Sequence, residues 1–290
     1  MPLPNSWQFQ AIGTDWNIQT DSLLSRDDKT QIRALIEVFN YNYSRFQPDS
    51  IVRTMYDVPG SYVFSDHHFP DLYALYEQLY KLTNGSVTPH VGKVLVDAGY
   101  DENYNLTSFS ETLRVAKFGE VVWDGKSTLT TKQPVLLDFG AAAKGLLVDQ
   151  IAELLQKMKH TEWFIDASGD SAHHASLPYV IGLEHPFDTS KIIGTVELSK
   201  ESLCASAINR RAWKNGHHVI DGKTGKPTED IVATWVIADS TMLADGLATG
   251  LFFTWEELVV TYPTVAYLRM DCSGTIEMNQ TMKERITLLG

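Results

Sequence analysis

One stretch of the sequence, His217 to Phe253, constrains the fold more than any other. Val219-Ile220 is β-branched, turn residues follow it, and the apolar run Ile231 to Ala238 predicts a buried strand. Ser240 can then accept a hydrogen bond from the free N–H groups of a helix start, and apolar residues follow at helical spacing: Met242, Leu243, Leu247, Leu251 and Phe252. The stretch therefore predicts a strand, a tight loop, a second strand and a helix, with polar residues gathered at one rim.

Two polar residues stand inside this otherwise apolar helix. Asp245 and Thr249 are four positions apart, so they lie one turn apart on the same face. A carboxylate and a hydroxyl are hard oxygen ligands that suit Mg²⁺ or Ca²⁺, with room left for water or a phosphate oxygen. On spacing alone, an Asp and a Thr that bond to a neighbouring loop at the edge of the core are the commoner arrangement.

A second block, Leu136 to Asp149, combines a short apolar strand, a run of small residues and a helix. The free N–H groups at the start of this helix favour an anion, and Lys144 adds a mobile positive charge, so a phosphate could bind there. The alternative is close packing of helix on strand beside a surface lysine, which is more frequent for small-residue turns.

Net charge and hydropathy disfavour several classes of partner. The net charge is −12, from 36 acidic and 24 basic residues, and no basic block stands out, which disfavours nucleic acid and anionic membranes as partners. No window approaches eighteen apolar residues, and the N-terminus does not resemble a leader peptide. Cys204 and Cys272 give no disulfide framework and are expected to be free thiols. We therefore expect a cytoplasmic protein.

The remaining segments predict helices mixed with strands. Trp7 to Thr20 is expected to be one opening strand, Arg26 to Arg45 and Asp71 to Leu82 to be helices, and Val121 to Lys126 to lie in a hairpin about Asp124-Gly125. No linker or repeat divides the chain. The expected fold is α+β: largely antiparallel sheets with packed helices, forming a single domain over residues 1–290 with two closely associated lobes and a ligand cleft between them.

These features together suit phosphate-ester chemistry. A divalent cation at Asp245 and Thr249 would neutralise charge that builds up in the transition state, and a nearby base would take the proton of an incoming hydroxyl. His218 is a candidate base because the ordinary histidine pKa is near the working pH. By itself, however, a histidine at this position is more often a hydrogen-bonding strand residue.

Three blocks resemble the FAD:protein FMN transferase family, also called the ApbE family. His218 to Pro227 resembles His-Ile-Ile-Asp-Pro-x-Thr-Gly-x-Pro, and Ala244 to Leu251 resembles Ala-Asp-Ala-Leu-Ala-Thr-Ala-Leu. Asp138 to Asp149 resembles Asp-Leu-Gly-Gly-Ile-Ala-Lys-Gly-x-x-Val-Asp. Weaker similarities begin at Ala11, so the resemblance covers most of the chain.

The resemblance implies an enzyme that transfers FMN from FAD to a Thr or Ser hydroxyl of an acceptor flavoprotein, with Mg²⁺ on the pyrophosphate and AMP as the product. It implies His218 as the catalytic base and a metal site made by Asp245, Thr249 and the carbonyl of Ala141. The residues that it implies for contact with FAD are Lys144, Thr224, Asp170, Ser206, Gly140 and Asp221.

Several positions depart from the family pattern. Gly222 replaces a proline, Val87 and Thr88 replace Phe and Asp, Ser168 replaces a glycine, and Ala207-Ile208 replaces Gly-Asp. Two alternatives therefore stay open: an FAD pyrophosphatase that gives FMN and AMP, and a flavin-binding protein without catalysis. The intact metal pair, Lys144 and His218 favour an enzyme over the non-catalytic alternative.

Overall fold

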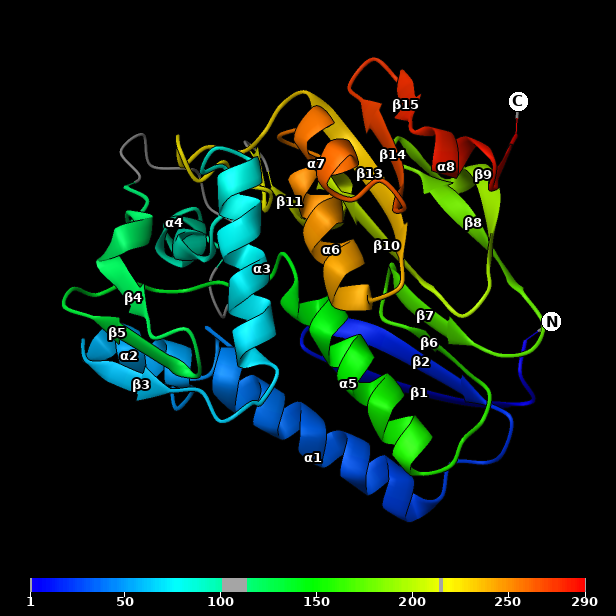
Figure 1. Cartoon of the computed structure of the whole chain (residues 1–290), viewed down its shortest axis with the longest axis horizontal. Helices are drawn as coiled ribbons and strands as arrows, with labels where there is room; N and C mark the ends of the chain where they lie inside the picture. Colours follow the sequence, from blue (N-terminus) through cyan, green and yellow to red (C-terminus); the bar gives the residue numbers. More distant parts are fainter. Residues whose placement is uncertain (1, 101–113, 214–215, 290) are drawn as a thin grey trace.

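The computed structural model describes residues 2–100, 114–213 and 216–289, and its fold is α+β, as predicted (Figure 1). The α-helices are α1 (Arg26–Tyr43), α2 (Ile51–Asp57), α3 (Phe69–Leu82), α4 (Gly92–Asp97), α5 (Ala143–Lys157), α6 (Thr241–Gly250), α7 (Glu256–Thr261) and α8 (Gln280–Lys283). The strands are β1 (Asn5–Ala11), β2 (Thr14–Thr20), β3 (Ser61–Val63), β4 (Val121–Trp123), β5 (Thr128–Thr131), β6 (Trp163–Asp166), β7 (Asp170–His174), β8 (Tyr179–His185), β9 (Asp188–Leu198), β10 (Ser202–Ala207), β11 (Ala212–Trp213), β12 (Gly216–His217), β13 (Ile231–Ala238), β14 (Ala266–Asp271), β15 (Ile276–Met278) and β16 (Ile286–Leu288).

The largest element is an eight-stranded sheet with the order β1-β2-β6-β7-β10-β13-β14-β15. Every neighbouring pair in it is antiparallel. Side chains alternate along β13, so Val236 and Ala238 enter one hydrophobic core while Trp235 and Ile237 enter another. Because both faces of the sheet are covered, β13 is apolar on both sides except for the buried Thr234.

Different elements cover the two faces. Helices α5 and α6 pack against each other and against β7, β10 and β13. The small sheet β16-β9-β8 contributes its apolar side chains to the core on the other face. A third sheet, β3-β5-β4, lies with α2 and α4 beyond α3, at the opposite end of the molecule from β8 and β9 (Figure 1).

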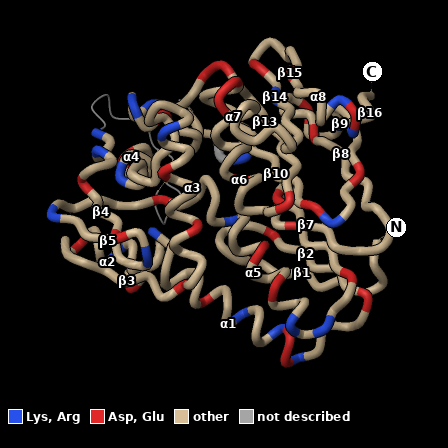
Figure 2. Tube along the Cα trace, viewed as in Figure 1, with Lys and Arg blue, Asp and Glu red and all other residues tan. Residues whose placement is uncertain are grey.

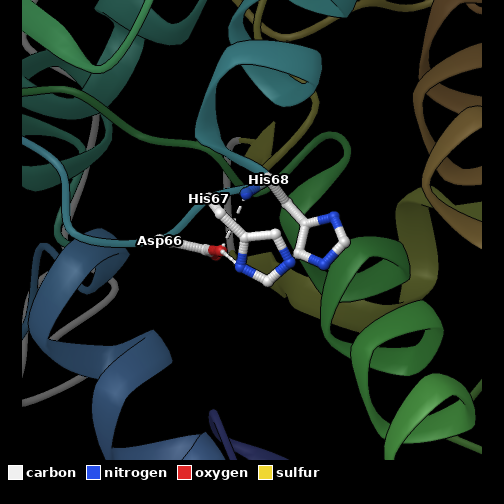
Figure 3. Close-up of side chains that lie close together, drawn as sticks. All are labelled: Asp66, His67 and His68. Atoms are coloured by element: carbon white, nitrogen blue, oxygen red, sulfur yellow. Dashed lines mark hydrogen bonds and ion pairs between the residues drawn. The ribbon is translucent and has the colours of Figure 1, made fainter.

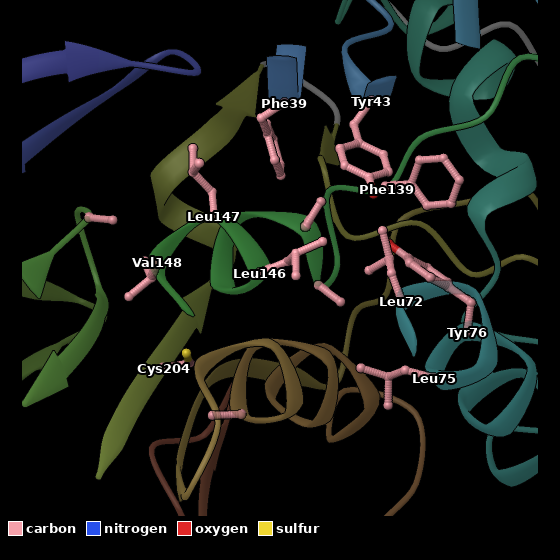
Figure 4. Packing of buried hydrophobic residues seen from close by; sticks show 14 of the residues in the cluster. Phe39, Tyr43, Leu72, Leu75, Tyr76, Phe139, Leu146, Leu147, Val148 and Cys204 are labelled. Atoms are coloured by element: carbon pink, nitrogen blue, oxygen red, sulfur yellow. The ribbon is translucent and has the colours of Figure 1, made fainter. Parts of the chain in front are cut away.

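Aromatic side chains join α1 and α3 to the segment that enters α5 (Figure 4). The ring of Phe139 makes edge contacts with Tyr43 and Tyr76, at centroid distances of 5.6 Å and 5.5 Å. Leu72 and Leu146 lie beside them in the same core, and all five residues are buried. Burial of rings and leucines at this density fixes the path of the 138–142 segment.

Three expectations about strands are wrong. Trp7 to Thr20 is a hairpin of β1 and β2, because Ile12 and Gly13 take positive φ values of 46° and 74° and reverse the chain. Leu136-Leu137 is buried but lies in the loop between β5 and α5 and not in a strand. Val219-Ile220 forms no strand either; Ile220 makes a single bridge to Pro227.

Other expectations are confirmed. The helices at 26–43 and 69–82 and the hairpin of β4 and β5 lie where the pattern predicts them. Cys204 and Cys272 are free cysteines. Acidic and basic residues are interspersed along the trace (Figure 2). Within the described ranges, no helix is both long enough and apolar enough to cross a bilayer.

Candidate active site

The site is built on the close approach of α5 and α6. A Cβ atom on Gly145 would lie 2.6 Å from the carbonyl carbon of Thr241 and 2.9 Å from Cβ of Asp245, so only glycine permits this helix crossing. The backbone N–H of Gly145 donates to Oδ2 of Asp245 at 2.9 Å. The small residue thus brings the first turn of α5 against the Asp245 carboxylate.

Asp149 holds the start of α6. Its carboxylate accepts hydrogen bonds from the backbone N–H groups of Thr241 and Met242 and from the Ser240 hydroxyl, each at 2.9 Å. Burial raises the pKa of Asp149 even though these bonds oppose the shift. The side chain of Ser240 caps Leu243 N–H at 3.3 Å, as the sequence predicts. The capped start of α6 fixes the direction in which Asp245 and Thr249 point.

Asp245, Asp170 and Lys144 form a buried charged cluster. Asp245 is 3% exposed, Asp170 is fully buried, and the Lys144 ammonium forms an ion pair with Asp170. Burial and the charge of Asp170 raise the pKa of Asp245 well above its ordinary value. Burial opposes the charge of Lys144, but Asp170 and Asp245 outweigh it and raise the lysine pKa. Two carboxylates thus face one ammonium group, which leaves the cluster one positive charge short when both are ionised.

Thr249 meets the loop that precedes α5. Its hydroxyl faces the carbonyl oxygen of Ala141 at 3.4 Å, and the N–H of Ala141 donates to the Tyr76 hydroxyl at 3.1 Å. Two of the three predicted metal ligands are therefore adjacent, and Asp245 lies one turn away from Thr249 on α6. Carboxylate, hydroxyl and carbonyl oxygens are the donor set that Mg²⁺ accepts, and a divalent cation would supply the missing charge. The residues present fit the metal.

An ion pair anchors the loop on its other side. Arg45, which is 4% exposed, donates from Nε to Oδ2 of Asp138 at 2.5 Å, and its guanidinium stacks on the ring of Phe46 at 4.1 Å. Oδ1 of Asp138 accepts the N–H of Gly140 at 2.7 Å. Asp138 thereby fixes the turn that presents Ala141.

The glycine-rich turn Asp221 to Gly225, which holds two of the residues implied for contact with FAD, packs on the loop after α3. Its backbone closes on itself through Gly225 N–H and the carbonyl of Asp221 at 2.7 Å, and Gly222 N–H donates to the carbonyl of Ser86 at 2.8 Å. A Cβ on Gly222 would lie 2.7 Å from the Gly85 oxygen and closer still to Cγ2 of Thr88. Two departures from the family pattern, Gly222 and Thr88, therefore touch, and the glycine makes room for the branched threonine.

A cavity of about 380 Å³ is lined by Gly169 and Ser171, the neighbours of Asp170, but not by Asp170 itself. Ser206 lines it together with Asp166 and Gly169, and β8 closes the opposite wall. Ser168, next to it, has a positive φ of 56°, which a serine tolerates less well than a glycine; its hydroxyl donates to the carbonyl of Asp15 at 2.9 Å. The cavity is within the usual size range of small-molecule sites.

The structure thus brings some of the predicted residues into direct contact. Asp245 and Lys144 share one buried cluster with Asp170, and Thr249 contacts Ala141. The others lie on separate segments: Gly140 in the loop before α5, Ser206 on the cavity wall, Asp221 and Thr224 in the glycine-rich turn, and the half-buried His218 just before it. Sequence reasoning did not predict the parts played by Arg45, Asp138 and Asp149.

Comparison with known proteins agrees with these motifs. A family model described as the ApbE family matches residues 12–262. A FAD:protein FMN transferase of Haemophilus influenzae is 25% identical over 279 residues, covering 86% of this chain and 80% of the relative. One from Vibrio cholerae is 26% identical over 278 residues, covering 85% and 80%.

Two solved structures show the same fold. The flavin transferase ApbE from Vibrio cholerae superimposes with a TM-score of 0.81 at 21% identity, covering 97% of this chain and 98% of that one. The ApbE protein of Thermotoga maritima gives a TM-score of 0.85 at 24% identity, with the same coverage.

Proposed function

Because the chain belongs to the ApbE family, we propose that it is a FAD:protein FMN transferase that moves FMN from FAD to a Thr or Ser hydroxyl of an acceptor flavoprotein and releases AMP, with Mg²⁺ bound. The observation that supports this function best is the buried cluster of Asp245, Asp170 and Lys144 beside the Thr249 hydroxyl and the Ala141 carbonyl. A negative cluster with hard-oxygen donors is what a divalent cation requires, and the bound cation would in turn attract the pyrophosphate.

In this proposal, Asp245, Thr249 and the Ala141 carbonyl hold Mg²⁺. The ion supplies positive charge against the pyrophosphate oxygens, where negative charge increases in the transition state. Gly145 N–H and Lys144 hold Asp245 and Asp170 in place, and the Asp149 cap keeps α6 in register with α5. The chain therefore arranges its metal ligands before FAD binds.

The remaining predicted residues bind FAD. Lys144 and Thr224 would contact phosphate oxygens. Ser206, Gly140, Asp221 and Asp170, the last through its ion pair with Lys144, would belong to the FAD site. A ring nitrogen of His218 takes the proton of the acceptor hydroxyl. The hydroxyl oxygen then bonds to the phosphorus of the FMN half of FAD, and the anhydride bond between that phosphorus and AMP breaks. Transfer in preference to hydrolysis requires that water be kept out until the acceptor docks.

The decisive experiment incubates the protein with FAD, Mg²⁺ and an acceptor domain, and follows the acceptor mass and AMP together. We expect one FMN mass on the acceptor for each AMP released. His218→Ala should slow this by roughly a hundredfold, the usual effect of losing a general base. AMP with free FMN and an unmodified acceptor would instead establish the FAD pyrophosphatase alternative, and FAD binding without AMP the non-catalytic one.

The metal ligands are tested with a matched pair at one position. Thr249→Ser keeps the hydroxyl and should retain Mg²⁺ dependence, whereas Thr249→Val keeps the shape and removes the ligand. Calorimetry in the presence of FAD should show weaker Mg²⁺ binding for the valine variant and none for Asp245→Asn. Equal Mg²⁺ affinity in all variants would exclude α6 as the metal-binding element.

A further inference from the structure

A second group of metal-ligating side chains lies away from this site. Asp66, His67 and His68 are consecutive and end at the first turn of α3, and one ligand atom from each lies within 4.8 Å of the others (Figure 3). Among residues 2–100, 114–213 and 216–289, no other three His, Cys, Asp or Glu side chains come this close. The group shares no residue with the Asp245 cluster.

The carboxylate in this group is already held in one orientation. Asp66 is 7% exposed, and its Oδ2 accepts the Tyr43 hydroxyl at 2.8 Å and Nε2 of Gln150 at 2.6 Å. Its Oδ1 accepts the backbone N–H of His68 at 3.0 Å and faces Nδ1 of His67 at 3.9 Å. Hydrogen bonds of this kind to a carboxylate are typical of a metal ligand, because the donors hold the carboxylate so that its free lone pairs are directed at the ion.

The loop itself is also fixed. Oδ1 of Asn42, in α1, accepts the backbone N–H groups of Ser65 at 2.8 Å and Asp66 at 3.3 Å. The two imidazole rings stand side by side, with centroids 3.9 Å apart, on the side of the loop that faces α5 (Figure 3). The two rings therefore already lie near enough for one ion to contact both.

A fourth ligand atom approaches from α5. Oε2 of Glu153 lies 3.6 Å from Nε2 of His68, and both residues line a second cavity of about 380 Å³. Neither the 3.6 Å nor the 3.9 Å separation is a hydrogen bond. Ligand atoms at about 2.0–2.1 Å from a tetrahedral ion stand roughly 3.4 Å from each other, so both separations are close to those around a shared metal ion.

We propose that Asp66, His67 and His68 bind a transition-metal ion of the Zn²⁺ class, with Glu153 as the nearest fourth ligand. Neutral imidazole favours Zn²⁺, Ni²⁺ or Cu²⁺ over Mg²⁺, so the ion differs in kind from the one expected at Asp245. Bound there, it would tie the start of α3 to α5, the helix that carries Lys144. The role is structural, and it does not depend on the proposed transferase activity.

The test is Zn²⁺ titration of the full chain, by calorimetry and by competition with a chromophoric chelator, on wild type, His67→Ala, His68→Ala and the control His185→Ala. The His67 side chain is 79% exposed, and the side chain of His68 makes no cap bond to α3, so neither change should harm folding. His185 lies on the β8–β9 hairpin and tests for adventitious binding by a surface histidine. Co²⁺ absorption reports the coordination number independently.

We expect one Zn²⁺ per chain in wild type and His185→Ala, and at least tenfold weaker binding in His67→Ala and His68→Ala. Zn²⁺ should raise the melting temperature of wild type but not of His67→Ala, and Asp245→Asn should bind Zn²⁺ like wild type. Equal Zn²⁺ affinity in the His67, His68 and His185 variants, or loss of Zn²⁺ binding in Asp245→Asn, would refute the proposal of a metal site at Asp66, His67 and His68.

Discussion

Replacement of Gly145 by alanine tests how tightly α5 and α6 are packed. In an ordinary helix the change would stabilise the fold by about 1 kcal/mol, because alanine has the higher helix propensity. Here the new Cβ would lie 2.6 Å from the Thr241 carbonyl carbon, and ordinary contact begins near 3.4 Å. Because the Thr241 oxygen would lie closer still, the helices would have to separate by at least about 0.8 Å, the difference between these distances. Overpacking of this kind costs roughly 1–3 kcal/mol, so it should outweigh the gain in propensity.

The separation would also weaken the bond from Gly145 N–H to Asp245. We therefore expect lower stability to denaturant together with weaker Mg²⁺ binding in Gly145→Ala. Urea denaturation followed by circular dichroism gives the free energy of unfolding, and calorimetry gives the metal affinity. Gly119→Ala is the matched control, since a Cβ there meets nothing within 4 Å. A Gly145→Ala protein as stable as wild type would refute the packing argument.

Packing and charge elsewhere in the chain give three further predictions. Gly222→Ala should lower the free energy of unfolding by roughly 1–3 kcal/mol, because the new Cβ would meet Thr88. Thr88→Ala in the same chain should restore part of that free energy, and a double-mutant cycle in urea would measure the restored part. Because burial raises the pKa of Asp245, Mg²⁺ must displace a proton, so its affinity in calorimetry should rise with pH and this rise should vanish in Asp245→Asn. Burial lowers the pKa of His90 from the ordinary 6.5 to about 4, so as the pH falls the unfolded chain binds the proton before the folded chain does. The free energy of unfolding should therefore fall by about 3 kcal/mol between pH 6.5 and pH 4. In urea titrations, His90→Gln should remove this part of the pH dependence.

Periodicity predicts the long elements of this fold well and its tight reversals poorly. The α6 pattern is unambiguous because Ser240 caps a helix whose apolar residues recur at helical spacing. The β1–β2 reversal is harder, because it places Ile12 at a positive φ that a β-branched residue rarely adopts. Local propensity there favours an extended chain, and pairing along the whole hairpin overrides it.

In the candidate site, too, local features can be predicted from the sequence and long-range partners cannot. The four-residue spacing of Asp245 and Thr249 is enough by itself to place both side chains on one helix face. The partners that orient such residues come from far along the chain: Gly145 is 100 positions from Asp245, and Arg45 is 93 positions from Asp138. Such pairs leave no local pattern. Asp66-His67-His68 is local and could have been noticed, since three ligand types stand side by side.

Three loops of the active site are joined in series by hydrogen bonds. Gly222 in the glycine-rich turn bonds to Ser86, the carbonyl of Pro89 accepts the N–H of Asp138, and the 138–141 segment ends at the Ala141 carbonyl that faces Thr249. A nucleotide that holds the first loop in this position also holds the Ala141 carbonyl where the cation needs it. Binding of a nucleotide at one end and of a cation at the other should therefore be cooperative. By thermodynamic reciprocity, each ligand must then raise the affinity for the other by the same factor.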